Sequence, residues 1–164
     1  LLDNLIITSY EPGSYGNLNI ANGTFNANNK NITCDSVNID CYDTATVIYM
    51  GSGTWEVTGN YDNAYPWDCD DWGDITIYCE TSMIKFTDTT DVMKYFIGGD
   101  KTYYNFWITG DGIGAYYIYD NNTFNDFKVD TPPHTVYFEE NSTTTVNTFT
   151  VNGQAEKLIT LDMS

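Results

Sequence analysis

The feature that most limits the possible folds is a short apolar triplet that recurs at nearly constant spacing. It occupies residues 106–108 (FWI), 127–129 (FKV) and 149–151 (FTV), so successive copies lie 21 and 22 residues apart. In each copy two apolar residues flank a variable one, which is the pattern of a strand with one buried face. A period near 20 residues with one such strand per copy is typical of a solenoid whose coils pack on one another.

The amino-terminal half shows a similar pattern at residues 18–20 (LNI), 37–39 (VNI) and 55–57 (WEV), which lie 19 and 18 residues apart. We therefore expect both halves to belong to one all-β parallel solenoid of about seven coils that spans residues 1–164. An antiparallel β-sandwich also produces many short alternating strands, but it does not require matching triplets at this period. Residues 60–74 interrupt the rhythm and are predicted to form an irregular loop insertion.

Composition supports a β-protein and narrows its partners. Aromatic residues make up 16% of the chain, which supplies buried area, and abundant Asn, Thr, Gly and Asp favour turns and strands over helices. The net charge of −17 repels phosphate backbones and anionic membranes, so nucleic acid is not an expected partner. No run of 18 apolar residues predicts a membrane span. The sequence starts at Leu1 without a signal peptide, which suggests a processed product or a piece of something longer.

Several segments resemble the coils of large right-handed parallel β-helix surface proteins. Residues 53–63 (GTWEVTGNYDN) resemble that family's "GTW.V.GN.DN" coil, residues 103–110 and 123–129 resemble "TFYNLTI.G", and residues 135–146 resemble "TV.F..G.TTTV". The resemblance covers residues 17–62 and 83–161, with departures at 34–41 and 64–74. Such repeats occur in secreted bacterial and metagenomic adhesins and in phage tail fibres. The resemblance implies a right-handed β-helix and an extracellular, cell-surface or virion location, but no particular chemistry.

The interruption at residues 60–74 is the most unusual segment and holds the candidate binding residues. Large aromatic side chains can stack on sugar rings while carboxylates accept hydrogen bonds from hydroxyl groups, which makes a glycan one candidate ligand. Carboxylate oxygens in a loop are also the ligands that Ca²⁺ prefers, although the spacing fits a calcium loop poorly. The candidate sugar-contacting residues are Tyr61, Tyr65, Trp67 and Trp72, and the candidate calcium ligands are Asp68, Asp70, Asp71 and Asp74.

The chain has four cysteines, Cys34, Cys41, Cys69 and Cys79, and no zinc-type CxxC pair. An even number of cysteines in an extracellular protein favours disulfides, and the local pairs Cys34–Cys41 and Cys69–Cys79 are one of three possible connectivities. The alternative is a set of buried, reduced cysteines that pack inside the solenoid as small apolar residues.

No residue pattern indicates catalysis. The single histidine, His134, follows two prolines at a predicted corner, and no nucleophile beside it suggests a triad. The expected function is therefore a non-enzymatic structural or adhesive module of a surface protein, tail fibre or filament, and the alternative is a polysaccharide-degrading or lyase-like spike. Open β-edges at both ends favour continuation into further coils or self-association. Four sequons place possible glycosylation at Asn22, Asn31, Asn121 and Asn141.

Overall fold

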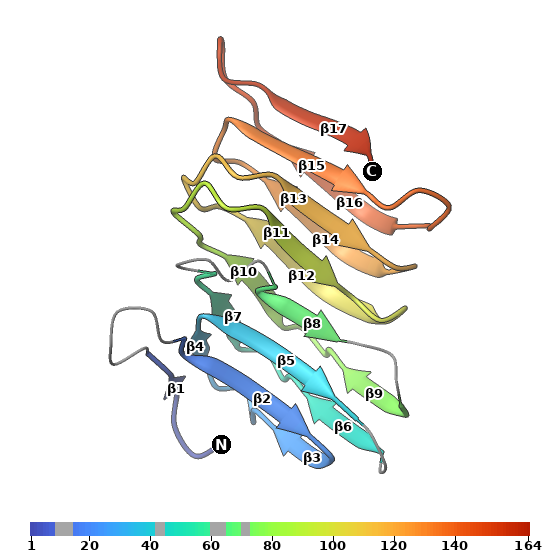
Figure 1. Cartoon of the computed structure of the whole chain (residues 1–164). Coiled ribbons are helices and arrows are strands. Elements are labelled where there is room, and N and C mark those ends of the chain that lie inside the picture. The colour runs from blue at the N-terminus through green and yellow to red at the C-terminus, as the bar shows by residue number, and fades with distance from the viewer. Residues whose placement is uncertain (9–14, 42–44, 60–64, 70–72) are drawn as a thin grey trace.

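The computed structural model describes residues 1–8, 15–41, 45–59, 65–69 and 73–164. These residues form a parallel β-solenoid, which confirms the predicted all-β class and solenoid architecture (Figure 1). Sheets A and B each contain seven strands, which correspond to about six turns of chain from the first strand to the last, close to the seven coils expected. The lowest coil in Figure 1 contains the amino terminus, and the highest contains the carboxyl terminus.

The chain visits the sheets in a fixed order. Each coil contributes one strand to sheet A and one to sheet B, and the three lowest coils add a strand to a small sheet C. Sheet A consists of β1 (Leu5–Ile6), β4 (Ile32–Cys34), β7 (Thr54–Val57), β10 (Met83–Phe86), β12 (Thr102–Ile108), β14 (Thr123–Val129) and β16 (Thr145–Val151). Sheet B consists of β2 (Asn17–Ala21), β5 (Ser36–Asp40), β8 (Trp67–Cys69), β11 (Lys94–Ile97), β13 (Tyr116–Tyr119), β15 (His134–Phe138) and β17 (Ile159–Met163). Sheet C consists of β3 (Gly23–Asn26), β6 (Thr46–Tyr49) and β9 (Ile75–Tyr78).

The carboxyl-terminal triplets occupy equivalent positions in successive coils, as predicted. Phe106 is in register with Phe127, and Phe127 with Phe149, on β12, β14 and β16. The amino-terminal triplets do not form one column: residues 18–20 and 37–39 lie in sheet B, whereas residues 55–57 lie in sheet A. An in-out-in pattern marks a half-buried strand but does not show which sheet the strand joins, so the spacing of these triplets does not equal one coil throughout.

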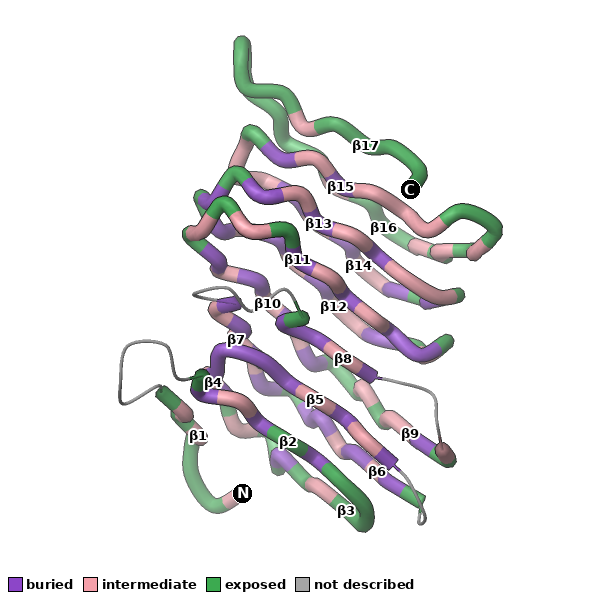
Figure 2. Tube along the Cα trace, in the orientation of Figure 1, coloured by how far each residue is buried: buried purple, intermediate pink, exposed green. Residues whose placement is uncertain are grey.

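Two structural features hold the coils together. The interior is filled by inward apolar side chains, many of them aromatic, and Figure 2 shows buried positions alternating along the strands of the middle coils. At the corners, side-chain amides and carboxylates accept hydrogen bonds from backbone N–H groups one coil higher. Asn31 Oδ1 accepts from the Thr54 N–H at 2.9 Å, and Asp100 Oδ1 accepts from the Asn121 N–H at 2.7 Å. The Asn- and Asp-rich composition thus satisfies corner backbone groups that no strand pairs.

The segment predicted as an irregular insertion is partly regular. Trp67–Cys69 forms β8, which pairs with β5 below and β11 above, so the prediction of an irregular loop was wrong for these residues. The extra length shows in the register of sheet A, where Trp55 and its partner Ile84 are 29 residues apart, against 21 to 23 for the other paired coils from β4 upward. The described residues contain no helix that is long and apolar enough to span a membrane.

Candidate functional site

The outer face of sheet B changes in character along the solenoid axis. Successive side chains of a strand point to opposite faces, so each sheet B strand sends alternate residues outward. In the lower coils these outward residues are Asn19, Asn38 and Asp68, whereas in the upper coils they are mainly tyrosines. One continuous face therefore presents polar groups and then aromatic groups.

Four tyrosines on this face form a ladder of stacked rings: Tyr65, Tyr95, Tyr117 and Tyr137. Successive ring centroids lie 5.1, 5.0 and 4.8 Å apart, and the interplanar angles are 22°, 27° and 15°. These distances match the strand spacing of about 4.8 Å because Tyr95, Tyr117 and Tyr137 stand on successive strands of sheet B and Tyr65 lies just before β8 in the coil below. Stacking covers the faces of the two inner rings, which leaves their edges toward solvent.

Beside the ladder lies a shallow depression of about 290 Å³, which we name the tyrosine pocket. It is lined by Tyr65, Tyr95, Ile97 and Tyr119. The Tyr119 ring is tilted by 45° from that of Tyr95, with the centroids 5.8 Å apart, so this pair does not stack flat. The pocket combines ring surface and an aliphatic side chain with phenol hydroxyl groups nearby, a mixture that suits a ligand with apolar and hydroxyl-bearing faces.

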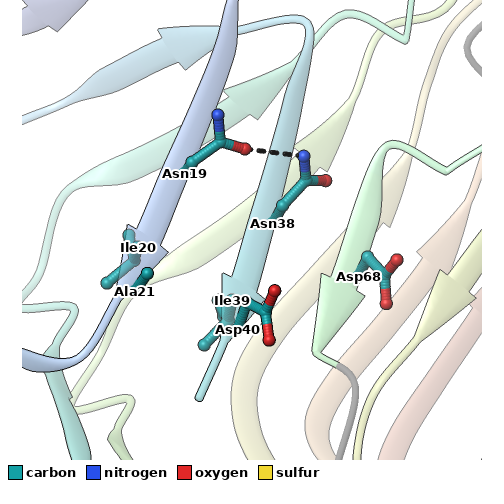
Figure 3. Close-up of a pocket in the computed structure, with 7 residues that line it drawn as sticks. All are labelled: Asn19, Ile20, Ala21, Asn38, Ile39, Asp40 and Asp68. Atoms are coloured by element: carbon teal, nitrogen blue, oxygen red, sulfur yellow. Dashed lines mark hydrogen bonds between the residues drawn. The ribbon is translucent and has the colours of Figure 1, made fainter. Parts of the chain in front are cut away.

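A second depression of about 390 Å³ lies lower on the same face, and we name it the amide pocket (Figure 3). Its lining residues are Asn19, Ile20, Ala21, Asn38, Ile39, Asp40 and Asp68. The Asn38 Nδ2 donates a hydrogen bond to Asn19 Oδ1 at 2.8 Å, which fixes both amides. Amides donate and accept hydrogen bonds while carboxylates only accept them, so the pocket can satisfy several hydroxyl groups at once.

Trp67, predicted as a sugar platform, is fully buried, so that prediction was wrong. Its ring centroid lies 5.9 Å from that of Trp55 and 6.0 Å from that of Phe96, and its Nε1 donates a hydrogen bond to the Tyr103 hydroxyl at 3.2 Å. Because β8 is a regular strand, alternation directs Trp67 into the core and its neighbour Asp68 outward.

Two of the other predicted site residues line pockets on the same face of sheet B, but they lie in different pockets. Tyr65 lines the tyrosine pocket and Asp68 lines the amide pocket, whereas Asp74 is exposed just before β9. Tyr61, Asp70, Asp71 and Trp72 lie outside the described residues. Within the described ranges, no three His, Cys, Asp or Glu side chains gather in a way that could hold a metal ion, and calcium binding stays a prediction from sequence.

The four cysteines form no disulfide bond, contrary to the predicted local pairs. Cys34 ends β4 in sheet A while Cys41 follows β5 in sheet B, and Cys69 ends β8 in sheet B while Cys79 follows β9 in sheet C. Residues close in sequence are therefore carried to different sheets by the coil. Burial raises the pKa of the Cys34 thiol to about 12, with Asp35 adding to the shift, so this thiol stays protonated.

The asparagines of all four sequons are exposed, and glycosylation stays a prediction. Asn22 and Asn141 occupy left-handed turn positions, with φ of 59° and 66°. Asn31 and Asn121 take part in the corner ladders, since Asn121 Oδ1 accepts a hydrogen bond from the Thr143 N–H at 2.9 Å.

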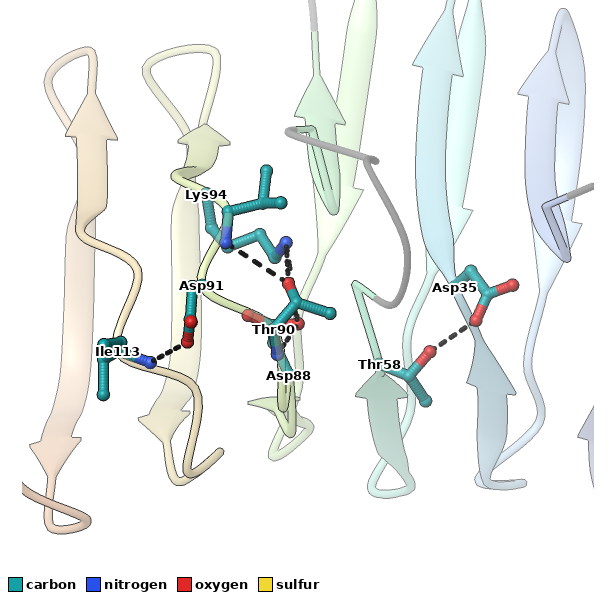
Figure 4. A network of polar contacts seen from close by, with 8 residues as sticks. Asp35, Thr58, Asp88, Thr90, Asp91, Lys94 and Ile113 are labelled. Carbon is teal, nitrogen blue, oxygen red and sulfur yellow. Dashed lines mark hydrogen bonds and ion pairs between the residues drawn. The ribbon is translucent and has the colours of Figure 1, made fainter. Parts of the chain in front are cut away.

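The corner that leads from sheet A to sheet B contains buried ionisable groups (Figure 4). The Lys94 Nζ lies 3.5 Å from Asp88 Oδ1 and donates to Thr90 Oγ1 at 2.9 Å, while the Thr90 N–H donates to the same Asp88 oxygen at 3.0 Å. Tyr116 and His134 are also buried and their rings meet edge to face at 5.2 Å. These side chains are out of reach of a dissolved substrate, so we assign them a structural role.

We expect His134 to make the folded protein less stable at mildly acidic pH. Its Nε2 donates to the Gly110 carbonyl at 3.0 Å, its Nδ1 has no hydrogen-bond partner among the residues that the structure describes, and burial lowers its pKa below the ordinary value of 6.5. A folded pKa below the unfolded one favours the neutral ring, so this contribution to stability is complete above pH 6.5 and is lost as the pH falls toward the folded pKa. Burial raises the pKa of Asp88, so this carboxyl group has the opposite effect and makes the folded protein more stable as the pH falls.

Urea unfolding near pH 7.5 and near pH 5.5 tests this expectation. The wild-type protein should lose more unfolding free energy between the two conditions than the His134→Gln variant, whose amide can still donate to Gly110 but does not titrate. Equal losses in both proteins would show that His134 is not the group responsible.

On the outer face of sheet A, the Trp107 ring contacts lysine side chains from both neighbouring strands. The Lys128 Nζ lies 4.1 Å and the Lys85 Nζ 5.3 Å from the ring centroid, and the Trp107 Nε1 donates to Asp130 Oδ1 at 2.7 Å. This arrangement stabilises adjacent coils through cation–π contacts and leaves little ring surface for a ligand.

The candidate binding residues predicted from the sequence do not include Tyr95, Ile97, Tyr117 or Tyr119, which form this face with Tyr65. A signal was present, because Tyr95, Tyr117 and Tyr137 lie 22 and 20 residues apart, close to the period of the apolar triplets. A side chain that recurs with the coil period on the outward position predicts a ladder on the solenoid surface.

No family model matches this chain, and no curated protein or solved structure matches it either. The fold and the surface together define a parallel β-solenoid with an amide and tyrosine face on sheet B. The fold agrees with the β-helix repeats that the sequence resembles.

Proposed function

We propose that this chain is a non-enzymatic structural and adhesive solenoid of an extracellular surface protein, tail fibre or filament, and that it contacts glycans through the outer face of sheet B. The observation that carries the proposal is the pair of depressions on one face, the amide pocket and the tyrosine pocket. The resemblance to surface β-helix repeats supports the location.

The chemistry of the two pockets fits a neutral, hydroxyl-rich ligand. Amides and carboxylates of Asn38, Asp40 and Asp68 can bind hydroxyl groups, and Tyr119 and Ile97 offer apolar surface to the C–H face of a sugar ring. The described residues that line the two pockets include no Lys or Arg, so they offer no counter-charge to acidic sugars. The solenoid fixes the outward side chains, which reduces the entropy lost on binding.

A glycan array followed by titration calorimetry with the best ligand tests this proposal. Tyr119→Ala and Asn38→Ala should each weaken binding by about tenfold, which corresponds to about 1.4 kcal/mol. Tyr78→Ala is a matched control, because Tyr78 is also an exposed tyrosine that stacks on a neighbour, Tyr49, at 4.8 Å, but belongs to sheet C. Absence of binding to any neutral glycan, or equal loss in the control, would contradict the proposal.

One observation favours the second candidate, a polysaccharide-degrading enzyme. Asp40 and Asp68 both line the amide pocket, and glycoside hydrolysis uses two carboxylates on either side of the scissile bond. Release of reducing ends from a polysaccharide, abolished in both Asp40→Asn and Asp68→Asn, would favour the enzyme. Binding without any release favours the adhesive module.

A further inference from the structure

The amide pocket and the tyrosine pocket lie on one column of outward side chains. Each member of this column is in register with the next member on the neighbouring strand of sheet B, in the order Asn19, Asn38, Asp68, Ile97 and Tyr119. The first three residues line the amide pocket and the last two line the tyrosine pocket. We name this column the axial track, because it crosses β2, β5, β8, β11 and β13 along the direction in which the coils stack.

The two pockets meet at the boundary between β8 and β11, which are neighbours in the sheet. Asp68 of the amide pocket is in register with Ile97 of the tyrosine pocket, and paired strands lie about 4.8 Å apart. The five strands of the track are separated by four such intervals, so the track is about 19 Å long. A single sugar ring would cover only a small part of it, whereas a chain of sugars can contact both pockets.

The track changes from polar to apolar along its length. At the lower end, the hydrogen bond from Asn38 to Asn19 holds the two amides, and the other polar atom of the Asn38 side chain points toward the strand of Asp68 (Figure 3). At the upper end, Tyr95 lies two residues before Ile97 on the same face of β11, so its ring forms one side of the track. Sugar hydroxyl groups can bind the polar positions, and the C–H face of a sugar ring can lie on the apolar positions.

The spacing of the track favours a particular shape of ligand. Successive track residues are raised by about 4.8 Å from one coil to the next. A pyranose ring in an extended, equatorially linked glycan advances the chain by nearly the same length, so such a chain can place one sugar on each coil. An α-1,4-linked chain of the same sugar curves, and it would leave a straight column after a few residues.

We propose that the axial track binds a linear, neutral, extended glycan that lies along the solenoid axis with about one sugar residue on each coil. This inference rests on the proposed glycan-binding function and specifies the class of ligand. The strands of sheet B hold the track residues at fixed spacing, so contacts to successive sugars add up with little further loss of protein entropy. Affinity should therefore depend on the length and the linkage of the glycan as well as on its sugar composition.

Titration calorimetry with oligosaccharides of two to six residues tests the proposal. The probes are β-1,4-linked oligomers of glucose, mannose and xylose, and the matched control is the α-1,4-linked glucose series, which has the same sugar in a curved chain. In at least one β-1,4-linked series, affinity should rise about tenfold or more from two to five residues and then level off, with one oligosaccharide bound per chain. The α-1,4-linked series should show no such rise.

The outcomes separate this inference from the proposed function. Equal affinity for two and five residues, two five-residue molecules bound per chain, or an equal rise in the α-1,4-linked series would overturn the axial arrangement and leave glycan binding in place. Binding of another neutral glycan without binding of any β-1,4-linked series would do the same. Absence of binding to every neutral glycan would contradict both proposals.

Variants locate the bound chain on the track. Asn38→Ala and Tyr119→Ala should each weaken binding of the same five-residue ligand, because one molecule contacts both ends, whereas at most one of them should affect a two-residue ligand. Ile97→Arg obstructs the junction of the two pockets and should weaken binding of the five-residue ligand about tenfold. Thr76→Arg is the control, because it adds the same charge at a half-buried position of β9 in sheet C and should leave binding unchanged.

An unchanged affinity in Ile97→Arg, or an equal loss in Thr76→Arg, would overturn the axial track. Circular dichroism confirms that each variant is folded.

Discussion

Replacing Trp67 with alanine should lower the free energy of unfolding by about 3 to 5 kcal/mol, the range measured for large aromatic side chains removed from cores. The side chain is fully buried, its ring meets Trp55 and Phe96, and its Nε1 donates to the Tyr103 hydroxyl. Removal leaves a cavity and a buried hydroxyl that loses a partner. Urea unfolding at neutral pH measures the effect.

Tyr65→Ala is the control for this prediction. Tyr65 is two residues away in sequence but lies on the outer face of sheet B, where it is 47% exposed and stacks on Tyr95 at the end of the tyrosine ladder. The Tyr65→Ala variant should lower the free energy of unfolding by about 1 kcal/mol or less. If the two variants were equally stable, Trp67 would not be part of the core in solution, and its predicted role as a surface platform would have to be reconsidered.

The second large effect is expected from Lys94→Met, which should lower the free energy of unfolding by about 3 to 5 kcal/mol at neutral pH. The change removes the cation that lies 3.5 Å from Asp88 and leaves a buried carboxylate without it. Burial already raises the pKa of Asp88, so protonation at acidic pH relieves the uncompensated charge. The loss measured by urea unfolding should therefore shrink as the pH falls.

Two further variants make this prediction specific. Combining Lys94→Met with Asp88→Asn should recover much of the lost stability, because the buried charge is then absent. The Lys128→Met variant is the control, because Lys128 forms an ion pair with Asp130 at the surface, with Nζ and Oδ2 2.7 Å apart. This change should lower the free energy of unfolding by only about 1 kcal/mol or less. A loss at Lys94 that is no larger than that at Lys128, or that is independent of pH, would contradict the assigned role.

The apolar period predicted the fold because it reflects a physical requirement of every coil. Phe106, Phe127 and Phe149 recur at one coil length since each must pack on the coil below, and this requirement is visible in sequence. The same period is present in Tyr95, Tyr117 and Tyr137, and it could have predicted the tyrosine ladder. Alternation within a strand, however, does not show which of the three sheets the strand joins, so the sequence pattern alone could not assign residues 18–20 to sheet B and residues 55–57 to sheet A.

The sequence by itself determined that this chain winds into stacked parallel coils, because coil packing repeats locally along the chain. Only the tertiary structure decided which side chains face solvent around residues 65–69, where β8 turns Trp67 into the core and Asp68 outward. It also separated the cysteines onto different sheets and joined Asn19, Asn38 and Asp68 into one pocket. These features depend on contacts between residues about 20 or more positions apart, which one coil's sequence does not encode.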